Sequence, residues 1–160
     1  MTGHTENAIV IDAPIELVWD MTNDVESWPS LFSEYSAAEI LHRDGDTVRV
    51  RLTTHPDAQG NVWSWVSERT ADPARLVVWA RRVEPGWFQY MNISWTYEPT
   101  DAGVRMTWIQ DFRMRPDSPV DEQAMTERLN RGSQVQLPLI KKNVESAARA
   151  REGGPQWTRR

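Results

Sequence analysis

The amino-acid sequence predicts an α+β fold in which a curved antiparallel sheet of seven strands surrounds one long C-terminal helix. Three observations lead to this prediction. The chain opens with a strand and two short helices, then six segments of period-two alternation follow through short turns, and helical periodicity runs from 120 to 151. A sheet of this size exposes one face unless it curls around something, and the last helix is the only long element available. With the short helices closing one end, an internal cavity remains.

The N-terminal segment predicts a strand followed by two short helices. Apolar and polar residues alternate over 6–12, which places Ala8 and Val10 on one side of the strand. We expect Asp12 to cap the first helix and Pro14 to lie in its first turn. A second short helix follows, interrupted near Pro29.

The middle of the chain predicts an antiparallel meander. Its connections are RDGD, HPDAQG, ADPA, EPG and PTDAG, all rich in turn-forming residues. The expected strands cover 36–43, 46–54, 61–70, 75–84, 88–98 and 103–113.

The C-terminal part predicts the long helix, which starts after the breaker RPDSP. Its apolar stripe advances by three or four residues through Met125, Leu129, Gly132, Gln136, Ile140, Val144 and Ala147. We expect one domain over 1–152 and a disordered tail over 153–160.

Composition excludes several classes of function. The net charge of −5 and the pI near 5.2 argue against nucleic-acid binding and against attraction to anionic membranes. There is no cysteine, no apolar run long enough to span a membrane, and no cluster of histidines, so we expect a cytoplasmic protein without metal or cofactor.

The expected strand over 61–70 carries an unusual mixture on one face. Trp63 and Trp65 share that face with Asn61, Ser67 and Arg69. Arginine is almost never buried without a partner, so an inward Arg69 indicates a polar ligand. The other interpretation places Arg69 at a cavity mouth, where its head reaches water.

Neighbouring strands offer matching faces. One presents Met91, Ile93, Trp95 and Tyr97, and the next presents Val104, Met106, Trp108, Gln110 and Phe112. Nine tryptophans exceed the number of Phe and Tyr together, and indoles suit a wall against a planar organic ligand. Simple packing against the long helix is the competing interpretation for the Trp and Met positions.

Long stretches of the chain resemble the monodomain aromatase/cyclases of bacterial type II (aromatic) polyketide pathways, of the tetracenomycin and spore-pigment type. The resemblance covers about residues 7–145 and rests on APIELVWDMTNDVESWPSLFSEYSAAEIL, NVWSWVSERT, YMNISWTY, MTERLN and IKKNVE. It implies a START-like helix-grip fold, which agrees with the predicted order of elements.

The resemblance also implies an enzyme and its site. Such enzymes close the first ring of a linear poly-β-ketone carried by an acyl carrier protein, joining carbon 9 to carbon 14, then dehydrate and aromatise it, and a second ring follows. Transferred by position, the catalytic residues are Arg69 and Tyr35. The substrate-binding residues are Trp28, Phe32, Trp63, Trp65, Ser67, Met91, Trp95, Trp108, Gln110 and Gln136. Gln136 stands where the tetracenomycin-type enzyme has asparagine.

The expected partners are therefore the acyl carrier protein and other polyketide synthase subunits. Because carrier proteins of this kind are usually acidic, docking needs a local basic patch, for which the sequence offers Arg81 with Arg82, Arg113 with Arg115, or Lys141 with Lys142. Three alternatives stay open: a non-catalytic carrier of a hydrophobic small molecule, a partner-binding subunit, and an enzyme joining carbon 7 to carbon 12.

Overall fold

The computed structural model describes residues 1–84 and 86–152. Its elements, in chain order, are β1 (Gly3–Ile11), α1 (Ile15–Asn23), the 3-10 turn η1 (Val25–Ser27), α2 (Trp28–Leu31), β2 (Tyr35–Asp44), β3 (Thr47–Thr54), β4 (Ser64–Asp72), β5 (Val77–Arg82), β6 (Phe88–Thr100), β7 (Gly103–Met114) and α3 (Glu122–Glu152).

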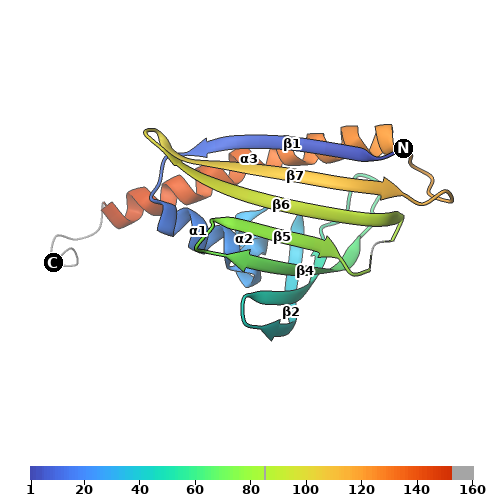
Figure 1. Ribbon diagram of the computed structural model, residues 1–160, viewed down its shortest axis with the longest axis horizontal. Helices are drawn as coiled ribbons and strands as arrows, with labels where there is room; N and C mark the ends of the chain where they lie inside the picture. The colour runs from blue at the N-terminus through green and yellow to red at the C-terminus, as the bar shows by residue number, and fades with distance from the viewer. Residues whose placement is uncertain (85, 153–160) are drawn as a thin grey trace.

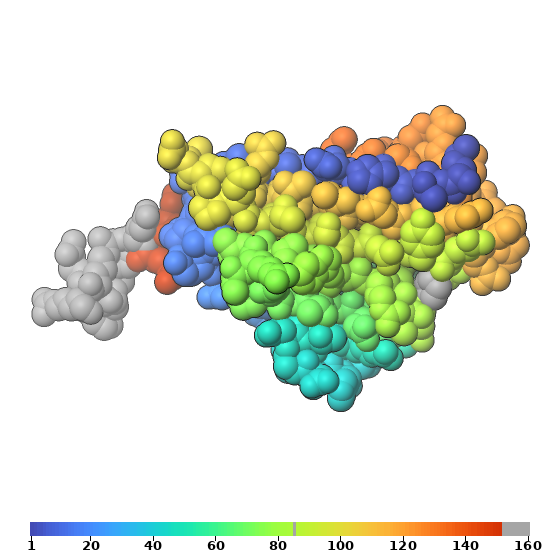
Figure 2. All heavy atoms as spheres, viewed as in Figure 1, coloured from blue at the N-terminus to red at the C-terminus, as the bar shows by residue number. Residues whose placement is uncertain are grey.

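The strands form one antiparallel sheet of seven strands in the order β1-β7-β6-β5-β4-β3-β2. The meander from β2 to β7 is continuous, and β1 joins the edge of β7. Figure 1 shows the sheet curving, with α3 running behind β1 and β7 and with α1 and α2 at one end. Side chains of β7, β6, β5 and β4 cover the face seen in Figure 2 in successive bands. The predicted architecture is confirmed.

The long helix packs into the concave side of the sheet. Ile140 and Val144 of α3 are fully buried and belong to the same core cluster as Ile11 and Met106. Polar contacts fix its position on β1, because the Asn7 amide donates to Asn130 Oδ1 at 2.9 Å and Lys141 Nζ donates to the Val10 carbonyl at 2.7 Å. The helix therefore has one register against the sheet.

Two details of the N-terminal segment differ from the prediction. The inner face of β1 carries Thr5 and Ile11, whereas Ala8 is exposed. The alternation predicts the wrong buried face because polar Thr5 and Asn7 point inward and are hydrogen-bonded there. Asp12 does not cap α1; the N-cap is Pro14, with no side-chain cap.

Strand ends account for the other differences. The strand predicted over 61–70 begins at Ser64 and continues to Asp72. Just before it, the Trp63 NH donates to the Thr54 hydroxyl at 3.0 Å and not to a main-chain carbonyl. The strand predicted over 75–84 is shorter, Val77–Arg82. The tail predicted over 153–160 lies outside the described residues.

Candidate active site

A cavity of about 530 Å³ lies between the sheet and α3. Residues from β3 to β7, from α2 and the start of β2, and from the first half of α3 line it. Exposed lining residues, among them His55, Glu84 and Arg128, mark its mouth. Arg69 and Val78, both at most 4% exposed, mark its deep end. The volume suits an organic molecule of several rings.

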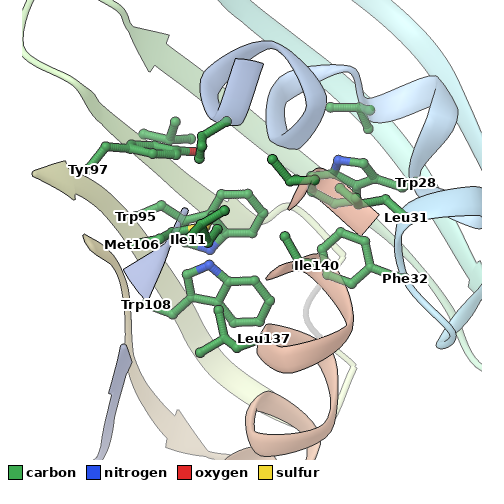
Figure 3. Close-up of a cluster of buried hydrophobic side chains, with 14 of the residues drawn as sticks. Ile11, Trp28, Leu31, Phe32, Trp95, Tyr97, Met106, Trp108, Leu137 and Ile140 are labelled. Atoms are coloured by element: carbon green, nitrogen blue, oxygen red, sulfur yellow. The ribbon is translucent and has the colours of Figure 1, made fainter. Parts of the chain in front are cut away.

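Stacked aromatic rings form one wall of the cavity. Trp95 and Trp108 come from paired positions of β6 and β7, and their rings stack at 4.9 Å with an interplanar angle of 8°. Phe32 stacks on Trp108 at 5.9 Å, and Trp28 stacks on Trp95 at 5.6 Å. Figure 3 shows these four side chains converging from the sheet and from α2 beside Leu137 and Ile140 of α3. The four rings pack on one another in one buried cluster, which makes this side of the cavity rigid and aromatic.

Arg69 points inward from β4, as the alternation predicts. It is 4% exposed and lines the cavity, and its guanidinium carbon lies 4.7 Å from the Trp95 ring centre and 5.0 Å from that of Trp28. Nη1 donates to Oδ1 of Asn23 at 2.8 Å. Nη2 is buried and has no hydrogen-bond partner among residues 1–84 and 86–152. A buried donor without a protein partner is rare, and it leaves one hydrogen bond of Arg69 available to an oxygen in the cavity.

The charge of Arg69 is not neutralised by an acid. Within the described part of the chain no carboxylate forms a salt bridge with it. Burial lowers the pKa of the Arg69 guanidinium to about 10, and the neighbouring Tyr97 and Tyr35 partly oppose this. Arg69 is therefore still cationic at neutral pH, inside an aromatic pocket.

A second set of polar groups lies nearer the mouth and includes Tyr35. Burial raises the pKa of the Tyr35 hydroxyl well above 10, and the adjacent Glu34 raises it further. Glu34 reaches the surface at the mouth, yet the protein encloses its carboxyl closely enough for burial to raise its pKa. Tyr35 is therefore a protonated hydroxyl at all physiological pH values.

Arg82 belongs to this second set. It lies over the rings of Trp65, at 4.2 Å, and Phe88, at 4.8 Å. Burial lowers its pKa to about 10, which Tyr35 and Glu34 counteract. The sequence predicts that Arg81 and Arg82 share an outer basic patch, and the structure corrects this: of the two, only Arg81 faces outward, where it pairs with Glu68 at 3.2 Å.

Three predicted polar residues line the cavity with part of their hydrogen-bonding capacity already used. Ser67 Oγ donates to the Arg81 carbonyl at 3.3 Å, and Gln110 Oε1 accepts from Thr5 at 2.8 Å. Gln136 accepts from the Ser33 NH at 3.0 Å and donates to the Ser33 hydroxyl at 2.9 Å. Gln136 thus also ties α3 to the segment after α2.

The structure brings together every site residue that the sequence analysis names. All twelve line the cavity: Tyr35, Arg69, Trp28, Phe32, Trp63, Trp65, Ser67, Met91, Trp95, Trp108, Gln110 and Gln136. Asn61, expected on the same face, is exposed and lies outside the lining. Asn23, Glu34, Arg82 and Arg128 are additional polar groups that the sequence analysis did not place at the site.

The described residues contain neither a metal-binding cluster nor a membrane-spanning helix. No group of three or more His, Cys, Asp or Glu side chains there could hold a metal ion. Among these same residues, no helix is long and apolar enough to cross a membrane.

Comparison with solved structures defines the class of fold. The aromatase/cyclase ZhuI from Streptomyces sp. R1128 superimposes with a TM-score of 0.78 at 26% identity, covering 97% of this chain and 100% of that one. A START superfamily protein from Mycobacterium smegmatis gives a TM-score of 0.77 at 16% identity over 90% and 98% of the two chains. The predicted START-like helix-grip fold is confirmed.

Sequence comparison gives the family. The model described as polyketide cyclase / dehydrase and lipid transport matches residues 11–137, so the chain belongs to that family. A Streptomyces cyaneus protein named "Putative polyketide cyclase" is 60% identical over 92% of this chain and 97% of its own length. The granaticin polyketide synthase bifunctional cyclase/dehydratase of Streptomyces violaceoruber is 26% identical over 94% of this chain and 45% of its own length. The prediction of an enzyme of the polyketide cyclase class is confirmed.

Proposed function

We propose that the protein directs the first-ring closure of a linear poly-β-ketone bound to an acyl carrier protein, by aldol reaction, dehydration and aromatisation. The observation that carries this proposal is Arg69, a buried cation whose Nη2 has no partner among the residues that the structure describes and which lies against stacked indoles in a cavity of about 530 Å³. A lipid carrier has no use for such a group, because burying an uncompensated charge is costly and gains nothing from an apolar ligand.

The main task in this reaction is selection of one closure among many. Methylenes flanked by two carbonyls are already acidic, so a weak base such as water in the cavity suffices to remove a proton. Carbonyls alternate along the chain, so a bond between carbons 9 and 14 forms when the carbanion at carbon 14 attacks the carbonyl at carbon 9. The aromatic side of the cavity, with Trp95 and Trp108, holds the chain folded for that attack.

Arg69 and Tyr35 have separate roles in the step. Arg69 Nη2 donates to the oxygen on which negative charge develops, and its guanidinium remains protonated throughout. Tyr35, kept protonated by burial and by Glu34, gives its proton to the alkoxide and regains one from the water that first deprotonated carbon 14. The resulting hydroxyl then leaves with the second proton of carbon 14 as one molecule of water. The same contacts serve closure of a second ring.

The carrier protein docks, in this proposal, beside the cavity mouth. Arg128 of α3 is exposed there and lies 5.6 Å from the Trp63 ring. The main-chain NH of Arg115 donates to the Trp87 carbonyl at the rim at 2.8 Å, but Asp117 pairs with the Arg115 guanidinium at 3.1 Å. Lys141 is likewise held, by Glu145 and the Val10 carbonyl, so Arg128 suits docking best. Such a reaction belongs to the cytoplasm, where carrier and synthase subunits would meet it.

Reconstitution with minimal polyketide synthase components tests the function. Adding the protein should replace spontaneous closure products by a single first-ring pattern in mass spectra and NMR. Tight binding of the chain with unchanged products would instead favour the non-catalytic carrier, and a carbon 7 to carbon 12 ring would favour the related enzyme class.

A further inference from the structure

The partner of Arg69 in the protein is a neutral amide. Asn23 is the last residue of α1, and its Oδ1 accepts from Arg69 Nη1 across 46 positions of the chain. An aspartate has nearly the same shape and would neutralise the buried guanidinium directly. The site thus contains the acceptor geometry of an ion pair without the negative charge.

Asn23 is itself held in one orientation. Its Nδ2 donates to the Trp19 carbonyl at 2.9 Å and to the Tyr97 hydroxyl at 3.3 Å. The Tyr97 hydroxyl lies 2.7 Å from that of Thr22, which donates to the Val18 carbonyl at 2.7 Å. These contacts occupy the nitrogen of the amide, so the oxygen is the atom that faces Arg69.

We propose that Asn23 is a positioning residue for Arg69: it fixes Nη1 and leaves Nη2 and the full positive charge for an oxyanion of the substrate. The inference rests on the proposed cyclase function. A carboxylate at position 23 would compete with the developing enolate or alkoxide, and a preorganised cation is effective only where no internal anion already satisfies it. Asn23 acts through Arg69 and does not line the cavity.

The test compares two substitutions at one position with a matched control. Both substitutions remove the Nδ2 donor to Trp19 and Tyr97. Asn23→Asp keeps the shape and adds a charge, whereas Asn23→Ser stays neutral but does not reach Arg69. Asn130→Asp is the control, because Asn130 Oδ1 also accepts from a side-chain donor, Asn7 Nδ2 at 2.9 Å, outside the cavity. Folding of each variant is checked by thermal unfolding.

The first readout is the rate of cyclised product in the reconstituted synthase. We expect Asn23→Asp to lower kcat by about 100-fold or more, as loss of an oxyanion donor does, with little change in KM. Asn23→Ser should lower kcat by about tenfold, since the cation remains but is less well placed. Asn130→Asp should match the wild type. Equal losses in Asn23→Asp and Asn23→Ser would overturn the argument from charge.

The second readout needs no cyclisation. Bound 4-nitro-1-naphthol ionises to a coloured phenolate, so absorbance gives its pKa in the cavity. The wild type should lower that pKa below the value in water, Asn23→Ser should retain most of the shift, and Asn23→Asp should abolish it. A full shift in Asn23→Asp would overturn the inference.

The two readouts separate the failure of the inference from that of the proposed function. If the wild type leaves polyketide products unchanged, the proposed function fails, while the naphthol titration still decides the role of Asn23. If Asn23→Asp does not fold, the test rests on Asn23→Ser. A kcat and a bound-naphthol pKa that both equal the wild-type values in Asn23→Ser would exclude a positioning role for Asn23.

Discussion

Arg81 and Arg82 are neighbours in the chain, yet they lie on opposite faces of β5. Arg81 is exposed and pairs with Glu68 at 3.2 Å, whereas Arg82 lines the cavity over Trp65 and Phe88. The alternation of a strand alone produces this difference. One arginine belongs to the outer surface and the other to the site, which gives an internally matched pair for mutagenesis.

Arg82→Gln should impair cyclisation and Arg81→Gln should not. Arg82 is a second cation in the cavity and holds down the pKa of Tyr35 and Glu34, so its loss should lower the product rate by about tenfold, the effect of one charged hydrogen bond. Rates in the reconstituted synthase check this. Equal rates for the two variants would show that Arg82 has no role in the chemistry.

The Tyr35 hydroxyl should not titrate in the folded protein near pH 10. Burial and then Glu34 raise its pKa above the ordinary value of 10.0, so the folded state keeps the proton that the unfolded state loses. The contribution of the protonated Tyr35 hydroxyl to the free energy of unfolding is fully present below pH 10 and is lost as the pH rises above 10. Tyrosinate absorbance of the wild type against Tyr35→Phe measures this. In Glu34→Gln the pKa of Tyr35 should fall toward its ordinary value. A Tyr35 hydroxyl that titrates near pH 10 in the wild type, or whose pKa is unchanged in Glu34→Gln, would contradict the assignment.

Trp108 and Trp63 should differ in what their removal damages. Trp108 is 7% exposed and stacks on Trp95, so Trp108→Ala should lower the free energy of unfolding by about 3–5 kcal/mol. Trp63 lies before β4, half-buried at the wall, so Trp63→Ala should lower it less and shift products toward shunt compounds. Urea unfolding with product analysis separates the two effects. A larger loss for Trp63 would contradict the assignment of Trp108 to the core.

Carrier docking should depend on Arg128. Reversing its charge with Arg128→Glu should raise KM for the carrier-bound chain several-fold and leave the spectrum of rings unchanged. The exposed Arg105 of β7, which does not line the cavity, gives the matched control Arg105→Glu. If both reversals raise KM equally, the effect comes from net charge and the docking surface lies elsewhere.

The strand faces near the site could be predicted because alternation there is strong. Trp65, Ser67 and Arg69 fall on the cavity face of β4 as expected, and paired positions on β6 and β7 bring Trp95 against Trp108. The prediction of which face of β1 is buried is wrong for a local reason. Thr5 and Asn7 point inward with hydrogen-bond partners on β7 and α3, and only the tertiary structure supplies those partners.

The polar groups that the sequence analysis did not place at the site have similar explanations. Two adjacent arginines on β5 resembled a surface patch, although period two already required one of them to point inward. Asn23 ends a short helix and gave no signal, since its role depends on a contact with Arg69 far along the chain. Long-range side-chain contacts of this kind are not encoded in local periodicity.

The charge of Arg69 directs ring closure in the proposed reaction, and the decisive experiment is Arg69→Ala in the reconstituted synthase. We expect a folded protein, because the substitution removes a buried charge that no acid of the described residues neutralises, and we expect loss of the regiospecific first-ring product. Arg81→Ala, on the outer face, should keep the wild-type products. Mass spectrometry gives the product profiles. Identical profiles for the wild type and Arg69→Ala would show that Arg69 does not direct ring closure.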